Sequence, residues 1–499
     1  MCIRKGGINI QLSKIIENLE VIEIIGEADR DITDINYDSR QVKEGSLFIC
    51  IKGFNIDGHK FIQEALERGA KAFLVEEDIN IQSKKNITVI KVKDTRMSMS
   101  KVASNFYENP SDKISIIGVT GTNGKTTITT LLKQILGINN KVGMIGTIKI
   151  DDGNRSIESQ NTTPESIDLQ KYINKMVQNK CRYCSMEVSS HSLVLGRVED
   201  IDFKVGVFTN LTPEHLDFHK NIDEYRKAKE LLFFKTKVAN IINIDDLNGQ
   251  IILSNIKNLR TKCYTYGINN KSDFMAKDIN LHYDSVSYTL VTPTYEEKIN
   301  IPLPGKFTIY NTLAVISVCY ILNISIDIIK EGLENTSGVE GRLENIKNDL
   351  GISVIVDYAH TPDALKNILS TVREFSKGKI ITVFGCGGDR DKTKRPIMGN
   401  ISQEYSDILI ITSDNPRNEN PIKIIEEIMS GINKDKENYM IIEDRKQAIK
   451  RAINIAKPKD IVIIAGKGHE NYQIIGDVKY YFDDREIARE CIKEKKDIL

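Results

Sequence analysis

The sequence has no net charge, because 69 Lys and Arg residues balance 69 Asp and Glu residues. A chain that coats nucleic acid or an anionic membrane through bulk attraction needs an excess of positive charge. The N-terminal residues lack the roughly 7–15-residue apolar stretch of a signal peptide. The longest apolar run, residues 313–329, is interrupted by polar side chains and is shorter than the roughly 20 apolar residues of a membrane span. We therefore expect neither a nucleic-acid partner nor a membrane partner.

The sequence also lacks the dense, short-spaced cysteines of a disulfide-stabilised secreted domain. Its eight cysteines are scattered at positions 2, 50, 181, 184, 263, 319, 386 and 491. Cys181 and Cys184 form one CxxC pair with neither a second pair nor a nearby histidine pair, so ordinary thiols are favoured over a structural zinc site. We expect a monomer in the reducing cytoplasm.

The length predicts several domains. A chain of 499 residues is too long for one hydrophobic core, since about one domain per 150 residues predicts three. Short apolar segments alternate with helical patterns, which predicts an α/β fold. Changes in pattern place an N-terminal domain at residues 1–108, a central domain with a mostly parallel sheet at 109–338, and a Rossmann-like C-terminal domain at 339–499. A helix is expected at 61–70, and a buried helix at 313–329.

Polar side chains follow four apolar strands of the C-terminal domain. These strands lie in segments 352–362, 379–390, 407–417 and 460–470. Ligands of open parallel sheets bind at the carboxyl ends of the strands, so the pattern predicts one crevice there. The residues expected around it are Asp357, His360, Arg390, Asp414, Arg417 and Glu470.

Residues 118–127, GVTGTNGKTT, lie between an apolar strand and a segment with helical spacing of apolar residues. The glycines let backbone N–H groups converge on phosphate oxygens, and the helix N-terminus adds its positive dipole end. Lys125 supplies a charge, and Thr126 supplies a hydroxyl for Mg²⁺. The standard phosphate loop has glycine where this chain has Val119. The order of strand, loop and helix still favours nucleotide binding over a chance glycine-rich turn.

The sequence TGTNGKTT resembles the ATP loop of the Mur ligase family, ATP-dependent enzymes that join amino acids to a nucleotide-linked cell-wall precursor. Further blocks resemble the family in the same order: NTTP at 161–164, MEVSSH at 186–191, NLTPEHLDFH at 210–219, YRKAKELLF at 225–233, GRLEN at 341–345, DYAHTP at 357–362 and GKGHE at 466–470. They span nearly the whole chain. DSR at 38–40, DGH at 57–59 and DNPR at 414–417 are most similar to the member that adds the third peptide residue, in its meso-diaminopimelate-using form.

The resemblance implies an ATP-dependent, amide-bond-forming ligase of peptidoglycan precursor synthesis, with ATP and Mg²⁺ as cofactors. Its substrates would be UDP-N-acetylmuramoyl-L-alanyl-D-glutamate and meso-2,6-diaminopimelate, joined through an acyl phosphate with release of ADP and phosphate. The N-terminal, central and C-terminal domains would hold the UDP-sugar, ATP and the incoming amino acid, respectively.

The resemblance also assigns residues to these ligands. Those for ATP are Gly121, Thr122, Asn123, Gly124, Lys125, Thr126, Thr127, Asn311, Arg342 and Asp357. Those for the UDP-linked substrate are Tyr37, Ser39, Phe54, Asn55, Asn161, Thr162, Thr163, Ser189 and Arg197. Those for diaminopimelate are Arg390, Asp414, Asn415, Pro416, Arg417, Gly466 and Glu470. The catalytic residues would be Lys125, Glu187, His215 and a carbamylated Lys229, with Thr126, Glu187, His215 and Lys229 near Mg²⁺.

Residue chemistry alone supports some of these roles better than others. Glu187 ends an apolar stretch, where a charge is costly unless it is paired or binds a metal, so a functional role is favoured over a buried salt bridge. His215 and His219 are four residues apart, but a histidine pair in a polar loop is more often structural. Lys229 in a helical segment is ordinarily a solvated charge. The roles of His215 and Lys229 therefore depend on the resemblance.

Substrate specificity is predicted from the arginines of the C-terminal domain. DNPR follows one apolar strand, and Arg390 follows another. An arginine fork matches a carboxylate in a bidentate manner, and meso-diaminopimelate differs from lysine by one carboxylate at its far end. A buried arginine that lysine left unpaired would discriminate strongly. Gly466 and Glu470 would orient the far amine.

The sequence leaves three alternatives open. The nearest is the same reaction with L-lysine as the added amino acid. A sister ligase that adds glutamate to folate is disfavoured by DSR and DNPR. A different class is a phosphate-loop protein that binds ATP and signals by closing. Such a protein would form no amide product and would tolerate Lys229→Ala.

Overall fold

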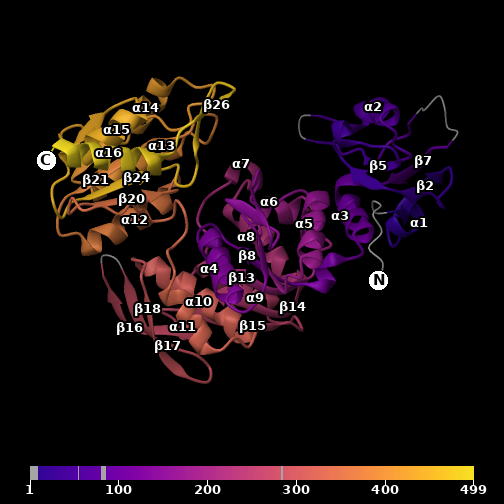
Figure 1. Cartoon of the computed structure of the whole chain (residues 1–499), viewed down its shortest axis with the longest axis horizontal. Helices are drawn as coiled ribbons and strands as arrows, with labels where there is room; N and C mark the ends of the chain where they lie inside the picture. Colours follow the sequence, from indigo (N-terminus) through magenta and orange to yellow (C-terminus); the bar gives the residue numbers. More distant parts are fainter. Residues whose placement is uncertain (1–8, 54–55, 80–85, 283–284, 499) are drawn as a thin grey trace.

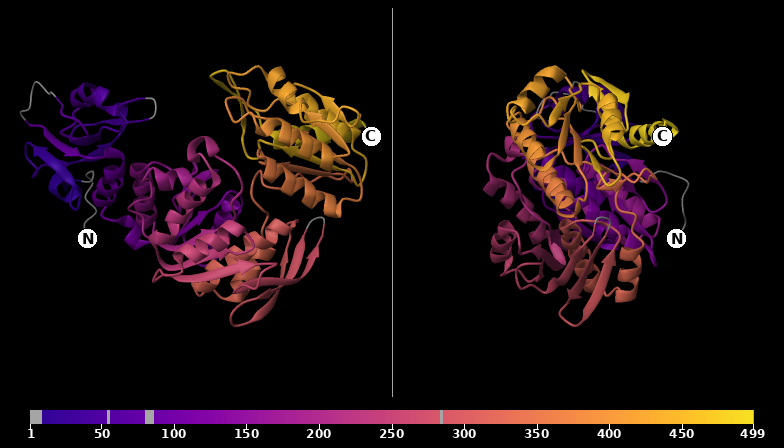
Figure 2. Two further views of the ribbon diagram at one scale, coloured as in Figure 1. Left: turned by 180° about the vertical axis from the view of Figure 1, so that it is seen from behind. Right: turned by 90° about the vertical axis from the view of Figure 1, so that its left-hand side faces the viewer.

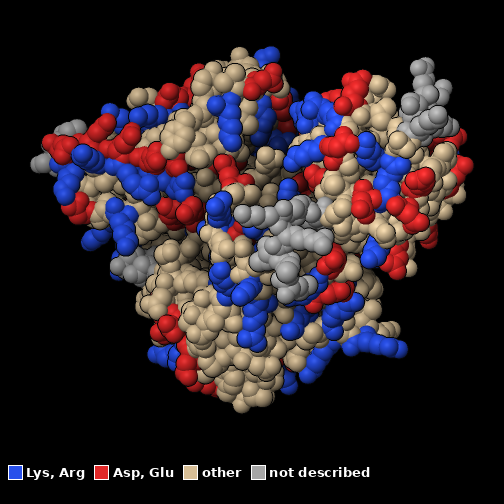
Figure 3. Space-filling view, turned by 45° about the vertical axis from the view of Figure 1, so that its right-hand side comes forward, with Lys and Arg blue, Asp and Glu red and all other residues tan. Residues whose placement is uncertain are grey.

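The computed structural model describes residues 9–53, 56–79, 86–282 and 285–498. Three α/β domains follow one another along the chain, with the N- and C-terminal domains on either side of the central one (Figure 1). The view from behind shows the same open arrangement, with the first and last described residues in different domains (Figure 2). Basic and acidic side chains are interspersed over the face shown in Figure 3. Within the described residues, no helix has the length and apolar character needed to cross a membrane.

The N-terminal sheet has the order β2-β7-β6-β5-β4, with β2 antiparallel and the others parallel. Its strands are β2 (Val21–Ile25), β4 (Asp34–Asn36), β5 (Ser46–Ile49), β6 (Ala72–Val75) and β7 (Thr88–Val92), beside the pair β1 (Ile10–Gln11) and β3 (Asp31–Ile32). The helices are α1 (Leu12–Ile15), α2 (Ile62–Glu67) and α3 (Thr95–Phe106), with 3-10 turns η1 (Ser39–Gln41) and η2 (Gly58–Phe61). The helix expected at 61–70 is shorter, because a 3-10 turn capped by Asp57 precedes it.

The central sheet has the order β11-β10-β9-β12-β8-β13-β14-β15-β16-β17-β18. The strands from β9 to β16 run parallel, and β10, β11, β17 and β18 add antiparallel edges. The strands are β8 (Ser115–Thr120), β9 (Val142–Ile145), β10 (Lys149–Asp151), β11 (Ser156–Glu158), β12 (Tyr183–Glu187), β13 (Phe203–Phe208), β14 (Thr236–Asn243), β15 (Lys262–Gly267), β16 (Phe274–Leu281), β17 (Val286–Val291) and β18 (Glu296–Ile301). The mostly parallel sheet expected for this domain is confirmed.

The helices of the central domain are α4 (Lys125–Gly137), α5 (Ser166–Gln178), α6 (Ser190–Val194), α7 (Leu216–His219), α8 (Ile222–Glu230), α9 (Leu247–Ile256), α10 (Lys306–Ile321) and α11 (Ile326–Glu334), with 3-10 turns η3 (Pro110–Lys113) and η4 (Leu231–Lys235). The helix expected at 313–329 is two helices, since Asn323 has a left-handed φ of 56° between them. Ser317 lies fully buried in α10 because its hydroxyl donates to the Leu313 carbonyl at 2.7 Å.

The C-terminal sheet has the order β19-β20-β24-β21-β22-β23. Its strands are β19 (Glu344–Asn345), β20 (Ser353–Asp357), β21 (Ile380–Phe384), β22 (Ile408–Ile411), β23 (Tyr439–Ile441) and β24 (Ile461–Ala465), and β25 (Tyr472–Ile475) and β26 (Val478–Tyr481) form a separate hairpin. The helices are α12 (Pro362–Phe375), α13 (Lys394–Tyr405), α14 (Pro421–Met429), α15 (Arg445–Ile455) and α16 (Asp484–Ile498). Alternate residues of β21 enter two different hydrophobic cores, so the sheet is buried on both faces. The carboxyl ends of the parallel strands β20, β24, β21 and β22 share one edge.

Each of these sheets lies within one of the three ranges expected from the sequence. The N-terminal sheet falls between residues 21 and 92, the central sheet between 115 and 301, and the C-terminal sheet between 344 and 465. We keep the boundaries 1–108, 109–338 and 339–499 as a proposal.

Candidate active site

The glycine loop joins β8 to α4 at the middle of the central sheet. Gly121 and Gly124 have φ values of 148° and 90°, which favour glycine. A Cβ at position 121 would lie 1.8 Å from the hydroxyl of Thr209, and one at position 124 would lie 2.6 Å from the side-chain oxygen of Asn311. Helix α4 begins directly after the loop, at Lys125. The loop backbone and the positive end of α4 therefore face the same space.

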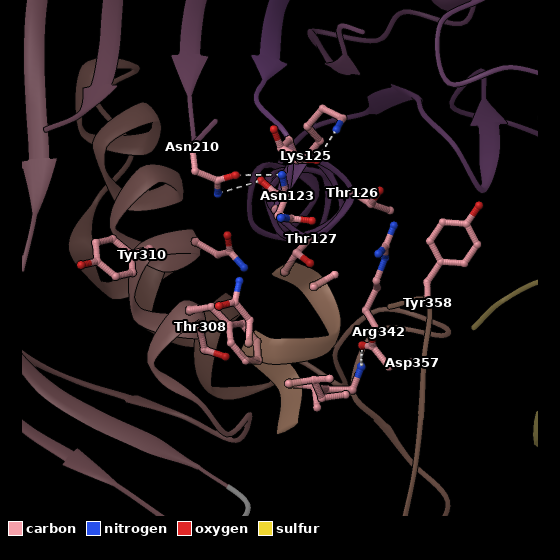
Figure 4. Close-up of a pocket in the computed structure, with 18 of the residues that line it drawn as sticks. Asn123, Lys125, Thr126, Thr127, Asn210, Thr308, Tyr310, Arg342, Asp357 and Tyr358 are labelled. Carbon is pink, nitrogen blue, oxygen red and sulfur yellow. Dashed lines mark hydrogen bonds between the residues drawn. The ribbon is translucent and has the colours of Figure 1, made fainter. Parts of the chain in front are cut away.

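Polar contacts hold this loop in place. The Lys125 ammonium donates to the carbonyl oxygens of Gly121 and Thr122 at 2.9 and 2.7 Å. Burial lowers the pKa of Lys125, although the negative charges of Glu187 and Glu214 oppose this effect. Figure 4 shows Asn210 beside Asn123, whose N–H donates to the Asn210 Oδ1 at 2.9 Å.

Glu187 stands at the carboxyl end of β12 and is 1% exposed. Its carboxylate accepts hydrogen bonds from the Thr126 hydroxyl at 3.0 Å, the Thr147 N–H at 2.9 Å and the Thr147 hydroxyl at 3.0 Å. Among the described residues, no basic side chain forms an ion pair with Glu187. A buried carboxylate held only by neutral donors is suited to a cation, and the hydroxyl oxygens around it suit Mg²⁺.

The described residues contain no group of three His, Cys, Asp or Glu side chains that could hold a metal ion. A magnesium site here would need the Thr126 hydroxyl and phosphate oxygens besides Glu187. Such mixed coordination is typical of Mg²⁺, which is usually bound by one or two carboxylates together with substrate phosphates. The residues present therefore fit the ion.

Lys229 lies in α8 and is 2% exposed. Its ammonium donates to the Gly121 carbonyl at 2.8 Å and lies 4.4 Å from the centre of the Tyr225 ring. Burial lowers the pKa of Lys229 well below its usual value, and the charge of Lys125 lowers it further, while Glu214 opposes the shift. A lysine with a depressed pKa carries more neutral amine, which is the form that can add CO₂.

Glu214 connects histidines of two domains. Its Oε1 lies 3.7 Å from His215 Nε2 and 3.8 Å from His360 Nε2 of the C-terminal domain. Burial acts to raise the pKa of Glu214, but the two histidines and nearby lysines outweigh it, so the pKa is lowered. His219 has another environment, because its Nε2 lies 2.8 Å from the Ser190 hydroxyl.

A cavity of about 630 Å³ lies between the central and C-terminal domains. Its lining includes loop residues 122–127, Glu187, His215, Thr308, Asn311, Arg342, Asp357 and His360. Arg342 points from the C-terminal domain toward Thr126 (Figure 4), and its guanidinium lies 4.7 Å from the Tyr358 ring centre. The buried Nε of Arg342 has no hydrogen-bond partner among the described residues. An unpaired guanidinium nitrogen opposite a glycine loop is suited to an anionic ligand.

Asp357 ends β20 on the same side of the cavity. The backbone N–H groups of Leu343 and Ala359 each donate to its carboxylate at 2.7 Å. Burial raises the pKa of Asp357, while Arg342 and these hydrogen bonds oppose the shift. These contacts fix the segment that carries Arg342.

The NTTP segment lies against Glu187. The Thr162 hydroxyl is 3.1 Å from the Thr147 hydroxyl, and the Thr163 hydroxyl donates to the Glu187 carbonyl at 2.9 Å. The Ser189 N–H donates to Thr163 at 3.1 Å. Two further candidates are near by: the Asn161 carbonyl accepts from Ser159 at 2.6 Å, and Arg197 donates to the Thr163 carbonyl at 3.0 Å and pairs with Glu165 at 2.8 Å.

The candidates of the N-terminal domain are less tightly grouped. The Tyr37 hydroxyl donates to Asp168 of α5 at 2.8 Å and so joins the first two domains. Tyr37 and Asp168 line a cavity of about 270 Å³. The Ser39 hydroxyl donates to Glu64 at 2.8 Å. Phe54 and Asn55 lie outside the described residues.

The third group of candidates surrounds the loop after β22. Arg417 is half-buried, and its guanidinium donates to the Gly388 carbonyl at 2.7 Å. The Asn415 amide donates to Glu470 at 3.0 Å. Lys467 is fully buried, and its ammonium donates to both Asn415 and Glu470 at 3.2 Å.

The six residues expected around one crevice lie in two places. Asp357 and His360 line the cavity beside the glycine loop, whereas Arg417 and Glu470 belong to the group around Asn415. Tyr358 joins the two places, since its hydroxyl is 3.5 Å from Glu470. Of the remaining candidates, Asp414 and Pro416 are buried beside Asn415, and Arg390 is exposed. Gly466 directly follows β24 and has a φ of 117°.

Comparisons with known proteins agree with this geometry. Sequence models of the family match three segments: the Mur ligase family catalytic domain at residues 31–108, the Mur ligase middle domain at 119–319, and the Mur ligase glutamate ligase domain at 341–468. A protein of Clostridioides difficile strain 630, named UDP-N-acetylmuramoyl-L-alanyl-D-glutamate--2,6-diaminopimelate ligase, is 62% identical over 97% of this chain and 100% of its own length. The chain belongs to the Mur ligase family. It is therefore a ligase.

Further relatives of this Mur ligase have the same name or the same fold. A protein so named from Alkaliphilus oremlandii strain OhILAs is 50% identical over 97% of this chain and 99% of its own length. A solved structure of a ligase with that name matches 98% of this chain and 99% of its own, with 30% identity and a TM-score of 0.70. A D-alanyl-D-alanyl-adding ligase from Acinetobacter baumannii, at 17% identity and a TM-score of 0.65 over 98% of both chains, shares the fold.

Sequence reasoning missed several residues of this Mur ligase site. Thr147 gives Glu187 two of its donors, but a single threonine after a strand carries no signal. Glu214 and Lys467 lie inside blocks that resemble the family. Both could have been identified as candidates because they are charged residues within such blocks.

Proposed function

We propose that this Mur ligase joins meso-2,6-diaminopimelate to UDP-N-acetylmuramoyl-L-alanyl-D-glutamate, with consumption of ATP and release of ADP and phosphate. The observation that carries the proposal is the full-length relative at 62% identity whose name states these two substrates. The geometry supports it, because the glycine loop and Arg342 face one cavity from two domains. The alternative in which L-lysine is the added amino acid is not favoured by that name.

The residues of the cavity have distinct proposed roles. The loop from Gly121 to Thr127 binds the phosphates, Asn311 contacts the adenine, and Arg342 and Asp357 complete the nucleotide site from the opposite domain. The residues that would hold Mg²⁺ are Thr126, Glu187, His215 and a carbamylated Lys229. When bound, the metal offsets the repulsion between the phosphates and the substrate carboxylate.

The reaction requires positioning more than a nucleophilic side chain. The γ-phosphoryl group of ATP is transferred to the D-glutamyl side-chain carboxylate of the acceptor, which becomes an acyl phosphate, and ADP is released. Lys125 neutralises the negative charge that develops on the phosphoryl group during this transfer. The acceptor is oriented beside Glu187 by Asn161, Thr162, Thr163, Ser189 and Arg197. Its UDP end is contacted by Tyr37, Ser39, Phe54 and Asn55. The two domains that enclose the cavity exclude water, so the amine of the incoming amino acid reacts instead.

The proposed amino-acid site is the group around Asn415. Arg417 and Arg390 recognise the far carboxylate. The far amine and the carbon chain of diaminopimelate are contacted by Asp414, Asn415, Pro416, Gly466 and Glu470. We further propose a cytoplasmic monomer that contacts no nucleic acid. The reducing compartment is supported by the cysteines of the described residues, which are all free thiols.

Phosphate release with and without each acceptor tests this function. ATP, Mg²⁺ and the UDP-linked dipeptide are supplied with diaminopimelate or with L-lysine. We expect release that requires the dipeptide and is faster with diaminopimelate, together with an amide product. Release independent of both acceptors would contradict the ligase assignment, whereas a preference for lysine would reject only the choice of amino acid.

Arg417→Ala is expected to weaken diaminopimelate binding. A charged hydrogen bond contributes about 1.5–3 kcal/mol, so KM for diaminopimelate should rise roughly 10- to 100-fold. KM for ATP should stay the same, because Arg417 does not line the cavity at the glycine loop. The control is Arg373→Ala, which removes an exposed arginine paired with Asp407 in the same domain. An equal rise in both KM values would argue against the assigned role.

A further inference from the structure

Arg395 of α13 is a fully buried arginine outside the residues assigned above. Its two terminal nitrogens bind the two carboxylate oxygens of Glu419, each at 2.9 Å. The guanidinium also donates to the Gly387 carbonyl at 3.1 Å and contacts Glu427 of α14. Arg395 thus touches the loop after β21, residues 385–390, and the loop after β22, residues 412–420. We call them the first and second loops.

Glu419 continues this connection. Its carboxylate also accepts the Asp389 N–H of the first loop at 2.6 Å. Hydrogen bonding from Arg395 is the main cause that lowers the pKa of Glu419 to about 2, so the carboxylate stays charged at neutral pH. The Asn418 amide adds a link to Asp389 at 2.9 Å.

The two loops are packed too closely for side chains between them. A Cβ at Gly388 would lie 1.9 Å from the Pro416 carbonyl, and one at Gly387 would lie 2.9 Å from the Arg417 guanidinium. The Gly388 N–H donates to the Asn415 carbonyl at 2.9 Å. The position of the Arg417 guanidinium therefore depends on the position of the first loop.

Arg417 is also held in an unfavourable backbone conformation. Its φ is 51°, a left-handed value that costs an L-residue roughly 1–2 kcal/mol. Backbone hydrogen bonds to the β25–β26 hairpin hold one side, from the Arg417 N–H to Ile474 at 3.1 Å and from the Gly476 N–H to Arg417 at 2.8 Å. The Arg395–Glu419 pair fixes the same loop on its other side.

We propose that Arg395 is a positioning residue for the incoming amino acid: with Glu419 it locks the first and second loops together and thereby sets the Arg417 fork for the far carboxylate. The inference rests on the proposed function, which places Arg417 at that carboxylate. A misplacement of about 1 Å in a binding group can cost roughly 10²-fold in rate. Loss of the lock therefore affects amino-acid recognition before it affects the nucleotide site.

Three variants test the lock in the full-length enzyme. Glu419→Gln keeps the side-chain size but removes the charge, and Arg395→Lys keeps the charge but removes the fork. Both are expected to raise KM for diaminopimelate roughly tenfold, with kcat and KM for ATP within about twofold of wild type, and to narrow the preference for diaminopimelate over lysine. The matched control, Glu427→Gln, removes the other carboxylate on Arg395 without touching either loop, and its KM values should stay within about twofold of wild type.

Asn418→Ala keeps the test decisive if the buried pair is essential for folding. It removes an exposed link between the same loops, and a two- to threefold rise in KM for diaminopimelate is expected. An unchanged KM in folded Glu419→Gln or Asn418→Ala, or an equal rise in Glu427→Gln, would overturn the proposal. If the wild-type enzyme prefers lysine, the proposed function fails, and KM for diaminopimelate in these variants relative to wild type then decides the lock separately.

Discussion

Lys229→Ala is expected to lower kcat by roughly 10²- to 10³-fold, the usual loss when one electrostatic stabiliser of a transition state is removed. The Lys229 amine is buried, donates to the Gly121 carbonyl of the glycine loop and has a lowered pKa. Addition of CO₂ to this amine would replace a cation with a carbamate that can approach Mg²⁺. Lys229→Arg should be equally inactive, because an arginine stays charged and forms no carbamate. Phosphate release in the complete reaction measures both variants.

The chemistry of the carbamate provides a second readout. CO₂ adds only to a neutral amine, so activity in bicarbonate-depleted buffer should fall as the pH decreases below the lowered pKa of Lys229, and added bicarbonate should restore it. ¹³C-bicarbonate should give a carbamate NMR signal that is missing in Lys229→Ala. Lys227→Ala, an exposed lysine of the same helix, is the control and should keep full activity. Full activity of Lys229→Ala would favour the signalling alternative over the ligase.

The buried strands of the C-terminal sheet could be predicted from short patterns. The run Ile380–Phe384 is apolar except for Thr382, which indicates a strand buried on both faces, and the structure confirms two cores around it. The break between α10 and α11 could not be predicted in the same way. Ser317 looks like an interruption in the sequence, yet its hydroxyl bonds within the helix, and the helix instead ends before Asn323.

The partners of the candidate residues were harder to predict than the candidates themselves. Tyr37 binds Asp168 across 131 positions, and Arg197 pairs with Glu165 in a different segment. Such contacts depend on how loops fold back, and no local spacing records them. The Arg395–Glu419 pair is another example, because both residues lie in segments rich in charged and polar residues, yet Arg395 is fully buried.

Glu187→Gln is expected to separate stability from activity more clearly than any other substitution in the site. The carboxylate is buried and, among the described residues, receives hydrogen bonds only from Thr126 and Thr147. The protein without ligands therefore bears the cost of a buried charge that has no ion-pair partner and is offset only in part by nearby Lys125. An amide of the same size removes that cost and can still accept the Thr147 N–H. The melting temperature of the ligand-free variant should therefore equal or exceed that of wild type, while kcat falls roughly 10²- to 10³-fold.

The response to Mg²⁺ then decides between a metal ligand and a structural residue. A ligand present at about 100 times its Kd stabilises a folded protein by about 2.7 kcal/mol, so ATP with Mg²⁺ should raise the melting temperature of wild type. In Glu187→Gln this rise should be largely lost, and the Mg²⁺ concentration needed for half-maximal activity should increase.

Thr147→Val keeps the charge of Glu187 and loses one hydrogen-bond donor to it, so it should show a smaller change in the same direction. Glu199→Gln, at an exposed position of the same domain, should match wild type. A destabilised Glu187→Gln with unchanged Mg²⁺ dependence would mean that the carboxylate supports the fold rather than the ion.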